Sequence, residues 1–67
     1  MTTTSIQTIE TRVPKDDNEG AARSRQLAYR GEDLTSHARA GYVLAHTATI
    51  DGTEYVTFVD TLTRVND

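Results

Sequence analysis

A shortage of bulky apolar side chains constrains this chain more than any other feature of its sequence. Seven of its 24 hydrophobic residues are alanines, which leaves 17 large apolar side chains among 67 residues. A chain this short buries a small share of its surface and usually needs disulfides, a metal or association to stay folded. The chain has no cysteine, which excludes disulfides and thiolate zinc sites. We therefore expect one domain over residues 1–67 that gains stability from self-association or from a partner.

Size and charge narrow the class of function. A domain this small rarely encloses a catalytic pocket, so we expect neither enzymatic activity nor a cofactor. The net charge of −3 gives no general attraction to nucleic acid or anionic lipid. The longest stretch without a charged residue, residues 40–50, is shorter than the roughly 20 apolar residues of a membrane span. Residues 1–5 lack the features of a secretory leader, and we expect them to be disordered. We expect a cytoplasmic protein.

The first half of the chain predicts a strand followed by helix. Residues 6–13 are rich in β-branched side chains, and the run stops at Pro14, so they indicate a strand. Residues 14–20 are polar and predict a surface loop. Residues 21–40 have the composition of a helix, but Gly31 followed by two acidic residues predicts a break and a fresh start there. The second helix should end at Gly41, while residues 21–30 are either a further helix or a mobile segment.

The second half of the chain predicts a β-hairpin. Two β-rich segments, residues 42–50 and 53–64, flank Asp51-Gly52, the dipeptide that favours a two-residue type I′ turn. Such a turn places Ile50 opposite Thr53 and leaves large apolar side chains on both faces of the sheet. The fold is therefore expected to be α+β, with order β-α-β-β, a three-stranded antiparallel sheet in spatial order 1-3-2 and one helical layer.

A single helical layer covers one face of that sheet, so the other face should be a contact surface. We expect the protein to form a homodimer there and to bind a macromolecular partner. The predicted self-association face consists of Tyr42, Leu44, His46, Ile50, Tyr55 and Val59.

Residues 32–64 also carry a resemblance to a known family. The matching residues are Leu34 and Ala38 in the helix, Gly41-Tyr42 at the helix-to-strand junction, Val43-Leu44 at the start of the hairpin and residues 55–59 in its returning strand. This span resembles a family of small bacterial and phage proteins, domain of unknown function 4177. The resemblance implies a strand, a helix and a C-terminal hairpin in a bacterial or phage protein, and it implies no activity.

Histidine and arginine are the remaining candidates for chemistry. The two histidines, His37 and His46, are too few for a metal site built from this chain's histidines alone. Arginine with interleaved aromatic residues can contact nucleic acid, which is the alternative function, although an acidic protein partner fits the same charges. The residues of this possible partner contact are Arg23, Arg25, Tyr29, Arg30 and Arg39.

Overall fold

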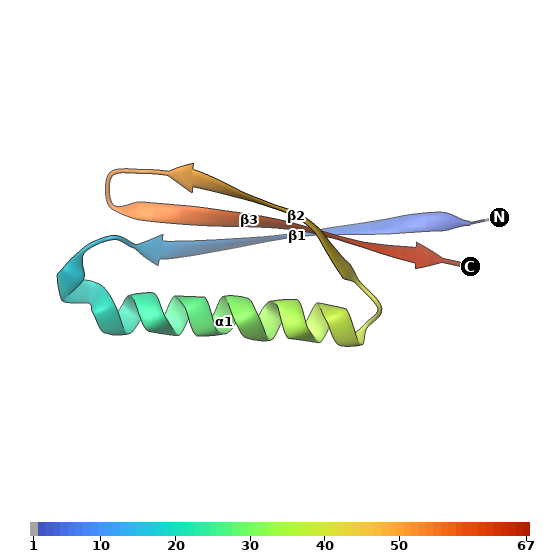
Figure 1. The fold of residues 1–67 in the computed structure, drawn as a ribbon, viewed down its shortest axis with the longest axis horizontal. Coiled ribbons are helices and arrows are strands. Elements are labelled where there is room, and N and C mark those ends of the chain that lie inside the picture. Colours follow the sequence, from blue (N-terminus) through green and yellow to red (C-terminus); the bar gives the residue numbers. More distant parts are fainter. Residues whose placement is uncertain (1) are drawn as a thin grey trace.

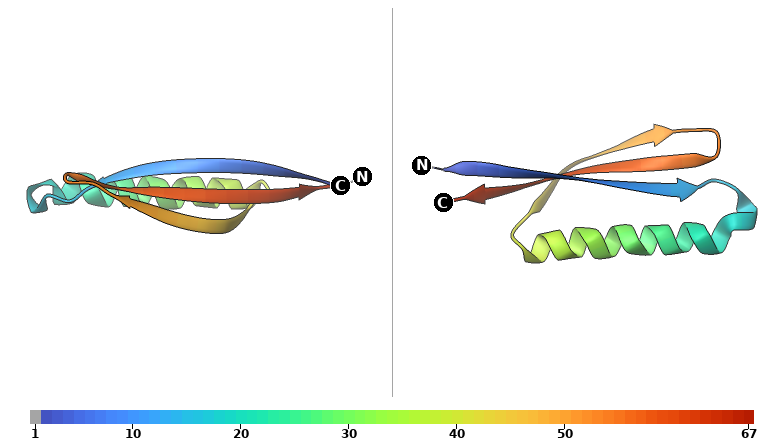
Figure 2. Two further views of the ribbon diagram at one scale, coloured as in Figure 1. Left: turned by 90° about the horizontal axis from the view of Figure 1, so that it is seen from above. Right: turned by 180° about the vertical axis from the view of Figure 1, so that it is seen from behind.

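The computed structural model describes residues 2–67 and contains three strands and one long helix (Figure 1). In chain order these elements are β1 (Thr3–Pro14), a short 3-10 turn (Asp17–Glu19), α1 (Gly20–Arg39), β2 (Val43–Asp51) and β3 (Tyr55–Asn66). The strands form one antiparallel sheet in the order β1-β3-β2, and Figure 2 shows β3 between its two neighbours. The predicted α+β class, element order and strand order are confirmed.

The first strand is longer than predicted. Residues 3–5, expected to be disordered, pair with the end of β3, from Thr3 opposite Asn66 to Ser5 opposite Arg64. The Asn66 side-chain amide also donates a hydrogen bond of 2.7 Å to Ser5 Oγ. Threonine favours extended backbone, and a paired neighbour supplies the hydrogen bonds that a free terminus lacks. Met1 lies outside the described residues.

The helix is continuous from Gly20 to Arg39, so the predicted break at Gly31 is wrong. The polar segment before it is also only partly a loop, because residues 17–19 form a 3-10 turn that leads directly into the helix. A glycine in a helix interior costs about 1 kcal/mol relative to alanine. Contacts on both sides of Gly31 hold the flanking turns of the helix, from Arg23 to the carbonyls of residues 14–16 and from the His37 ring to Tyr42.

The end of the helix agrees with its prediction. Gly41 has a φ of 91°, in the left-handed region that suits glycine. Its N–H donates to the carbonyl of Ala38, and the N–H of Tyr42 donates to the carbonyl of His37, both at 3.0 Å. These two bonds form a Schellman motif, which ends the helix and turns the chain into β2.

The hairpin is present, but its predicted register is wrong by four residues. Ile50 lies opposite Thr57, not Thr53. Neither Asp51 nor Gly52 has the positive φ that a type I′ turn requires, and the Gly52 N–H instead donates to the carbonyl of Tyr55 at 2.8 Å. Contacts from outside the hairpin accompany the changed loop. The Lys15 ammonium contacts the Asp51 carboxylate at 2.6 Å and the Gly52 carbonyl at 2.9 Å, and the Lys15 N–H donates to the carbonyl of Glu54.

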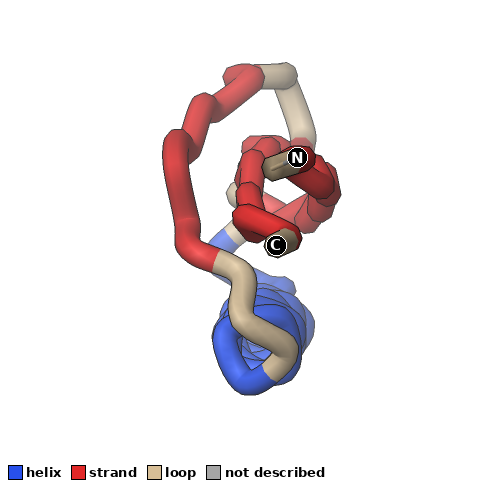
Figure 3. Tube along the Cα trace, turned by 90° about the vertical axis from the view of Figure 1, so that its right-hand side faces the viewer, coloured by secondary structure: helices blue, strands red, loops and turns tan. Residues whose placement is uncertain are grey.

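The molecule is thin and elongated, with Cα extents of 51 × 20 × 10 Å. Helix α1 lies on one side of the strands, as the view along the long axis shows (Figure 3). Within residues 2–67, Val13 and Leu62 are the buried members of the hydrophobic core, with Pro14 beside them, and no residue of α1 is fully buried. The scarcity of bulky apolar residues is therefore visible as a very small core.

Candidate interaction surfaces

The face of the sheet that points away from α1 is the first candidate surface. Residues directly opposite each other in paired strands share a face, and the buried Asp60 and Leu62 identify the face toward the helix. The opposite face, here called the outer sheet face, carries apolar side chains, threonines, one histidine and the oppositely charged Glu10 and Arg12. Its apolar residues and its histidine are Ile6, Val43, His46, Ala48, Ile50, Tyr55, Val59 and Val65.

Four of the six residues predicted for self-association lie on the outer sheet face: His46, Ile50, Tyr55 and Val59. A β-bulge between Leu44 and His46 moves the other two to the helix side. Leu44 now lies opposite the buried Leu62. The ring of Tyr42 packs edge-on against His37 of α1, with ring centroids 5.5 Å apart, and the Arg64 guanidinium lies 4.8 Å above it.

The outer sheet face is open to solvent. Ile6 is 65% exposed, Val43 67%, Ile50 59% and Val65 64%, whereas the two buried core side chains expose 6% or less. The apolar residues gather at both ends of the face, because Ile6 and Val43 flank Thr63 and Ile50 lies near Tyr55. A polar row of Thr8, Thr61 and His46 separates the two ends. The end that contains Val43 is apolar, whereas the end that contains Ile50 also carries Glu10 and Arg12, which lie opposite Val59 and Thr57.

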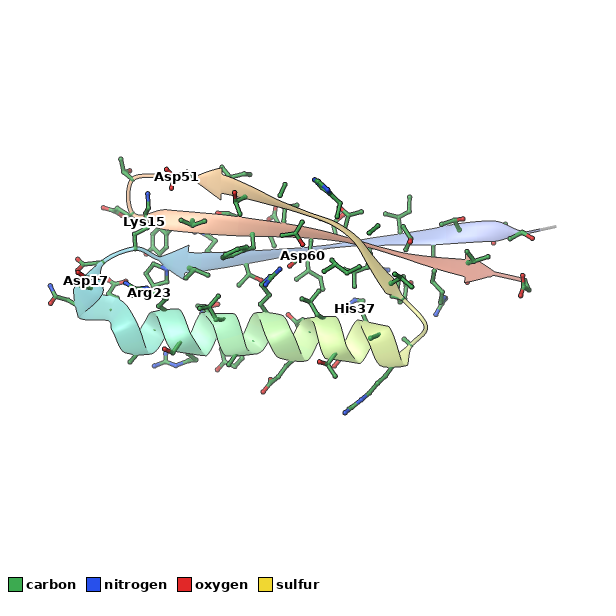
Figure 4. All side chains as sticks on the ribbon, viewed as in Figure 1. Lys15, Asp17, Arg23, His37, Asp51 and Asp60 are labelled. Carbon is green, nitrogen blue, oxygen red and sulfur yellow. The ribbon has the colours of Figure 1, made fainter. Side chains whose placement is uncertain are left out.

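On the helix side, a buried ion pair joins α1 to the sheet. Asp60 is fully buried, and Figure 4 shows it on the sheet above the helix. Arg30 donates two hydrogen bonds to its carboxylate, at 2.8 and 2.9 Å, and Thr47 donates a third at 2.7 Å. The hydrogen bonds from Arg30 lower the pKa of Asp60 against the opposing effect of burial, and Thr47 adds to the lowering. The same contact with Asp60 raises the pKa of Arg30.

The predicted partner-contact arginines do not act as a group. Arg23 donates hydrogen bonds to the carbonyls of Pro14, Lys15 and Asp16 and lies 3.7 Å from the Asp17 carboxylate (Figure 4), so it ties the start of α1 to the end of β1. Arg30 is held by Asp60, with its guanidinium 4.8 Å from the ring of Phe58. Arg25 and Arg39 are exposed elsewhere on α1, and Tyr29 is half exposed.

The two histidines have different surroundings. The Nδ1 atom of His37 lies 2.7 Å from the carbonyl oxygen of Asp33, one helical turn away, and its ring contacts Tyr42. His46 is exposed on the outer sheet face. Residues 2–67 contain no cluster of three side chains suited to hold a metal ion.

A second candidate surface was not predicted from the sequence. A groove of about 710 Å³ runs between β1 and α1, here called the β1 groove. Its strand wall is made by Glu10, Thr11 and Arg12. Its helix wall includes a stripe with helical spacing, formed by Ala22, Gln26, Tyr29 and Asp33. The helical spacing of this stripe, in steps of four, three and four residues, is visible in the sequence, but its pairing with β1 depends on the fold.

Comparisons with known proteins find no relative of this chain. No protein-family model matches the chain, and neither the curated proteins nor the solved structures contain a significant match. Among residues 2–67, no helix has the length and apolar character needed to cross a membrane.

Proposed function

We propose that this protein is a small non-enzymatic interaction module that forms a homodimer through the outer sheet face and binds a macromolecular partner. The observation that carries the dimer is the contrast between the two sides of the sheet. Ile6, Val43 and Ile50 are each more than half exposed on one side, while the core on the other side buries little more than Val13 and Leu62. Exposed apolar patches of this kind mark contact surfaces.

A second copy is the occupant that best fits the pattern of the outer sheet face. The face has exposed apolar side chains at each end and a polar row of Thr8, Thr61 and His46 in its middle, and its Ile50 end also carries the opposite charges of Glu10 and Arg12. A two-fold axis through the polar row brings the patch containing Val43 onto the patch containing Ile50 of the second copy, and the reverse. Both patches are covered in one symmetric contact, and the polar row meets itself.

Sedimentation equilibrium at tens of micromolar protein tests the dimer. The wild-type chain should sediment as a dimer, and Val43→Lys and Ile50→Lys should each sediment as a monomer because a buried lysine has no partner at the contact. Ala28→Lys, on the exposed side of α1, introduces the same charge elsewhere and should remain dimeric. A folded wild-type monomer under these conditions contradicts the proposal.

Nucleic-acid binding through the helical arginines receives less support. Arg23 and Arg30 use their donors on the Pro14 region and on Asp60, so they are not available as phosphate ligands without loss of those contacts.

A cytoplasmic location and the likeness to domain of unknown function 4177 remain parts of the proposal. Microscopy or fractionation of the tagged protein in its host tests the location.

A further inference from the structure

The β1 groove exposes a strand edge. Glu10, Thr11 and Arg12 line the groove in succession. Successive side chains of a strand point to opposite faces, so a cavity lined by three neighbours lies along the edge of the strand, where backbone N–H and C=O groups point outward. β1 pairs with β3 alone in the described sheet. The groove therefore offers a row of backbone hydrogen bonds to an extended chain.

The groove is also strongly acidic. Its lining includes four carboxylates, those of Glu10, Glu19, Glu32 and Asp33, against one arginine. The guanidinium of that arginine, Arg12, lies 4.5 Å from the centre of the Tyr55 ring. Acidic side chains along a groove attract basic groups and repel acidic ones. The charge of the lining therefore selects for a cationic occupant.

The size and the aromatic lining fit a short peptide. A volume of about 710 Å³ lies within the range of roughly 300–1,000 Å³ that binding pockets occupy. Tyr29 on the helix wall is 50% exposed, so its ring offers an apolar contact in the groove. An extended peptide places alternate side chains on opposite sides, so every second side chain would face the helix wall, which presents Tyr29, Glu32 and Asp33.

We propose that the β1 groove binds a basic extended segment of another protein, which adds to the sheet as a fourth strand beside β1. The backbone of the segment pairs with the edge of β1 near Thr11, its lysine or arginine side chains reach Glu32 and Asp33, and the aliphatic stems of those side chains pack on Tyr29. This inference rests on the partner-binding part of the proposed function and names that partner's chemistry. Glu10, Arg12 and Tyr55 belong both to the groove lining and to the outer sheet face, so the peptide site and the dimer are tested separately below.

A pair of synthetic peptides tests the inference directly. The first is a blocked heptapeptide of alternating lysine and valine, and the second replaces each lysine with glutamate. In a titration followed by two-dimensional NMR, the lysine peptide should shift the amide signals of residues 9–14 and of the helix stripe from Ala22 to Asp33. Amide exchange in β1 should slow as its edge becomes paired. The glutamate peptide should leave these signals unchanged.

A charge-matched pair of variants decides whether the groove carboxylates are responsible. The double variant Glu32→Gln, Asp33→Asn should weaken binding of the lysine peptide about fivefold or more, as expected for the loss of two exposed ion pairs. The control double variant Glu54→Gln, Asp67→Asn removes the same charge outside the β1 groove and should bind like wild type. Glu54 lies in the hairpin loop and Asp67 at the end of the chain.

Four results overturn the inference: no binding of the lysine peptide, equal binding of both peptides, shifts confined to the outer sheet face, or equal losses in the two double variants. Sedimentation of the same samples separates this inference from the dimer. A monomer that binds the lysine peptide in the groove contradicts the dimer alone, and a dimer that fails to bind it contradicts the peptide site alone.

Discussion

At the scale of single residues, Asp60 connects the two layers of the molecule. Its carboxylate is fully buried and accepts hydrogen bonds from Arg30 of α1 and Thr47 of β2. No residue of α1 is fully buried, so the helix has little apolar contact to hold it against the sheet. The three hydrogen bonds therefore fix the position of α1 on the sheet, and they also stabilise the fold.

We predict that Asp60→Asn lowers the free energy of unfolding by about 3 kcal/mol, because Arg30 then lies part-buried without a counter-charge. Urea denaturation at neutral pH measures this loss. The matched control is Asp51→Asn, which breaks the exposed pair with Lys15 and should cost less than about 1 kcal/mol. Equal effects of the two substitutions contradict the role assigned to Asp60.

The same residue predicts a dependence of stability on pH. The pKa of Asp60 is lowered in the folded protein, chiefly by the hydrogen bonds from Arg30, from an ordinary value of 3.8. A depressed folded pKa contributes stability that is present above the unfolded pKa and is lost as pH falls through the folded value. The urea midpoint should therefore fall as pH drops below about 4.

The comparison variant for this pH dependence is again Asp60→Asn, which has no titrating group at the position. Its urea midpoint should fall less than that of wild type between neutral pH and about pH 2. Parallel pH profiles for the two proteins would show that other carboxylates cause the loss.

The importance of Asp60 could not be predicted from the sequence. Arg30 and Asp60 are 30 positions apart, and each belongs to an element whose rotation is set by other contacts. A charged residue in a strand is ordinarily an exposed one, so nothing local marks Asp60 as buried. Only the packing of α1 against the sheet turns it into a buried partner.

At the scale of elements, Gly31 is the position at which helix propensity destabilises α1. A methyl group added to its Cα would meet no atom within 4 Å, so alanine fits there without displacement. Gly31→Ala should raise the free energy of unfolding by about 1 kcal/mol, the difference in helix propensity between the two residues. Thermal unfolding should show an increase of about 4–8 °C.

Gly41→Ala is the natural contrast, because Gly41 has a φ of 91° and an added methyl group would lie 3.3 Å from Cδ of Arg64. It should lower the melting temperature. An unchanged or lower melting temperature for Gly31→Ala contradicts the assignment of Gly31 to an open side of the helix.

The hairpin shows which properties of an element are local. The position of the loop and the identity of both strands could be predicted, because β-branched segments around Asp51-Gly52 are a local signal. The register could not, because the loop also meets Lys15 from a distant part of the chain, a contact that no local sequence signal reveals. A shift of four residues is even, so His46 and Ile50 kept their predicted face. The bulge after Leu44 has no comparable sequence signal, and it changed the face of Leu44.

At the scale of the whole molecule, the proposed dimer predicts that stability depends on protein concentration. Association that requires the folded chain favours the folded state by mass action. Over about a hundredfold range of concentration, the melting temperature of wild type should rise by at least about 5 °C. Val43→Lys, with a large apolar side chain of the outer sheet face replaced by a charge, should melt at the same temperature throughout. A constant wild-type value contradicts the dimer.

The two ends of the described chain lie together at one tip of a rod 51 Å long, where Thr3 pairs with Asn66 (Figure 1). Neighbours in an antiparallel pair are about 5 Å apart at their Cα atoms, so a few residues suffice to join them. The chain can therefore be closed into a ring at this tip and reopened in the loop at residues 52–54 with its strand pairing intact. It can equally be inserted into a surface loop of another protein, from which it would project as a rigid extension.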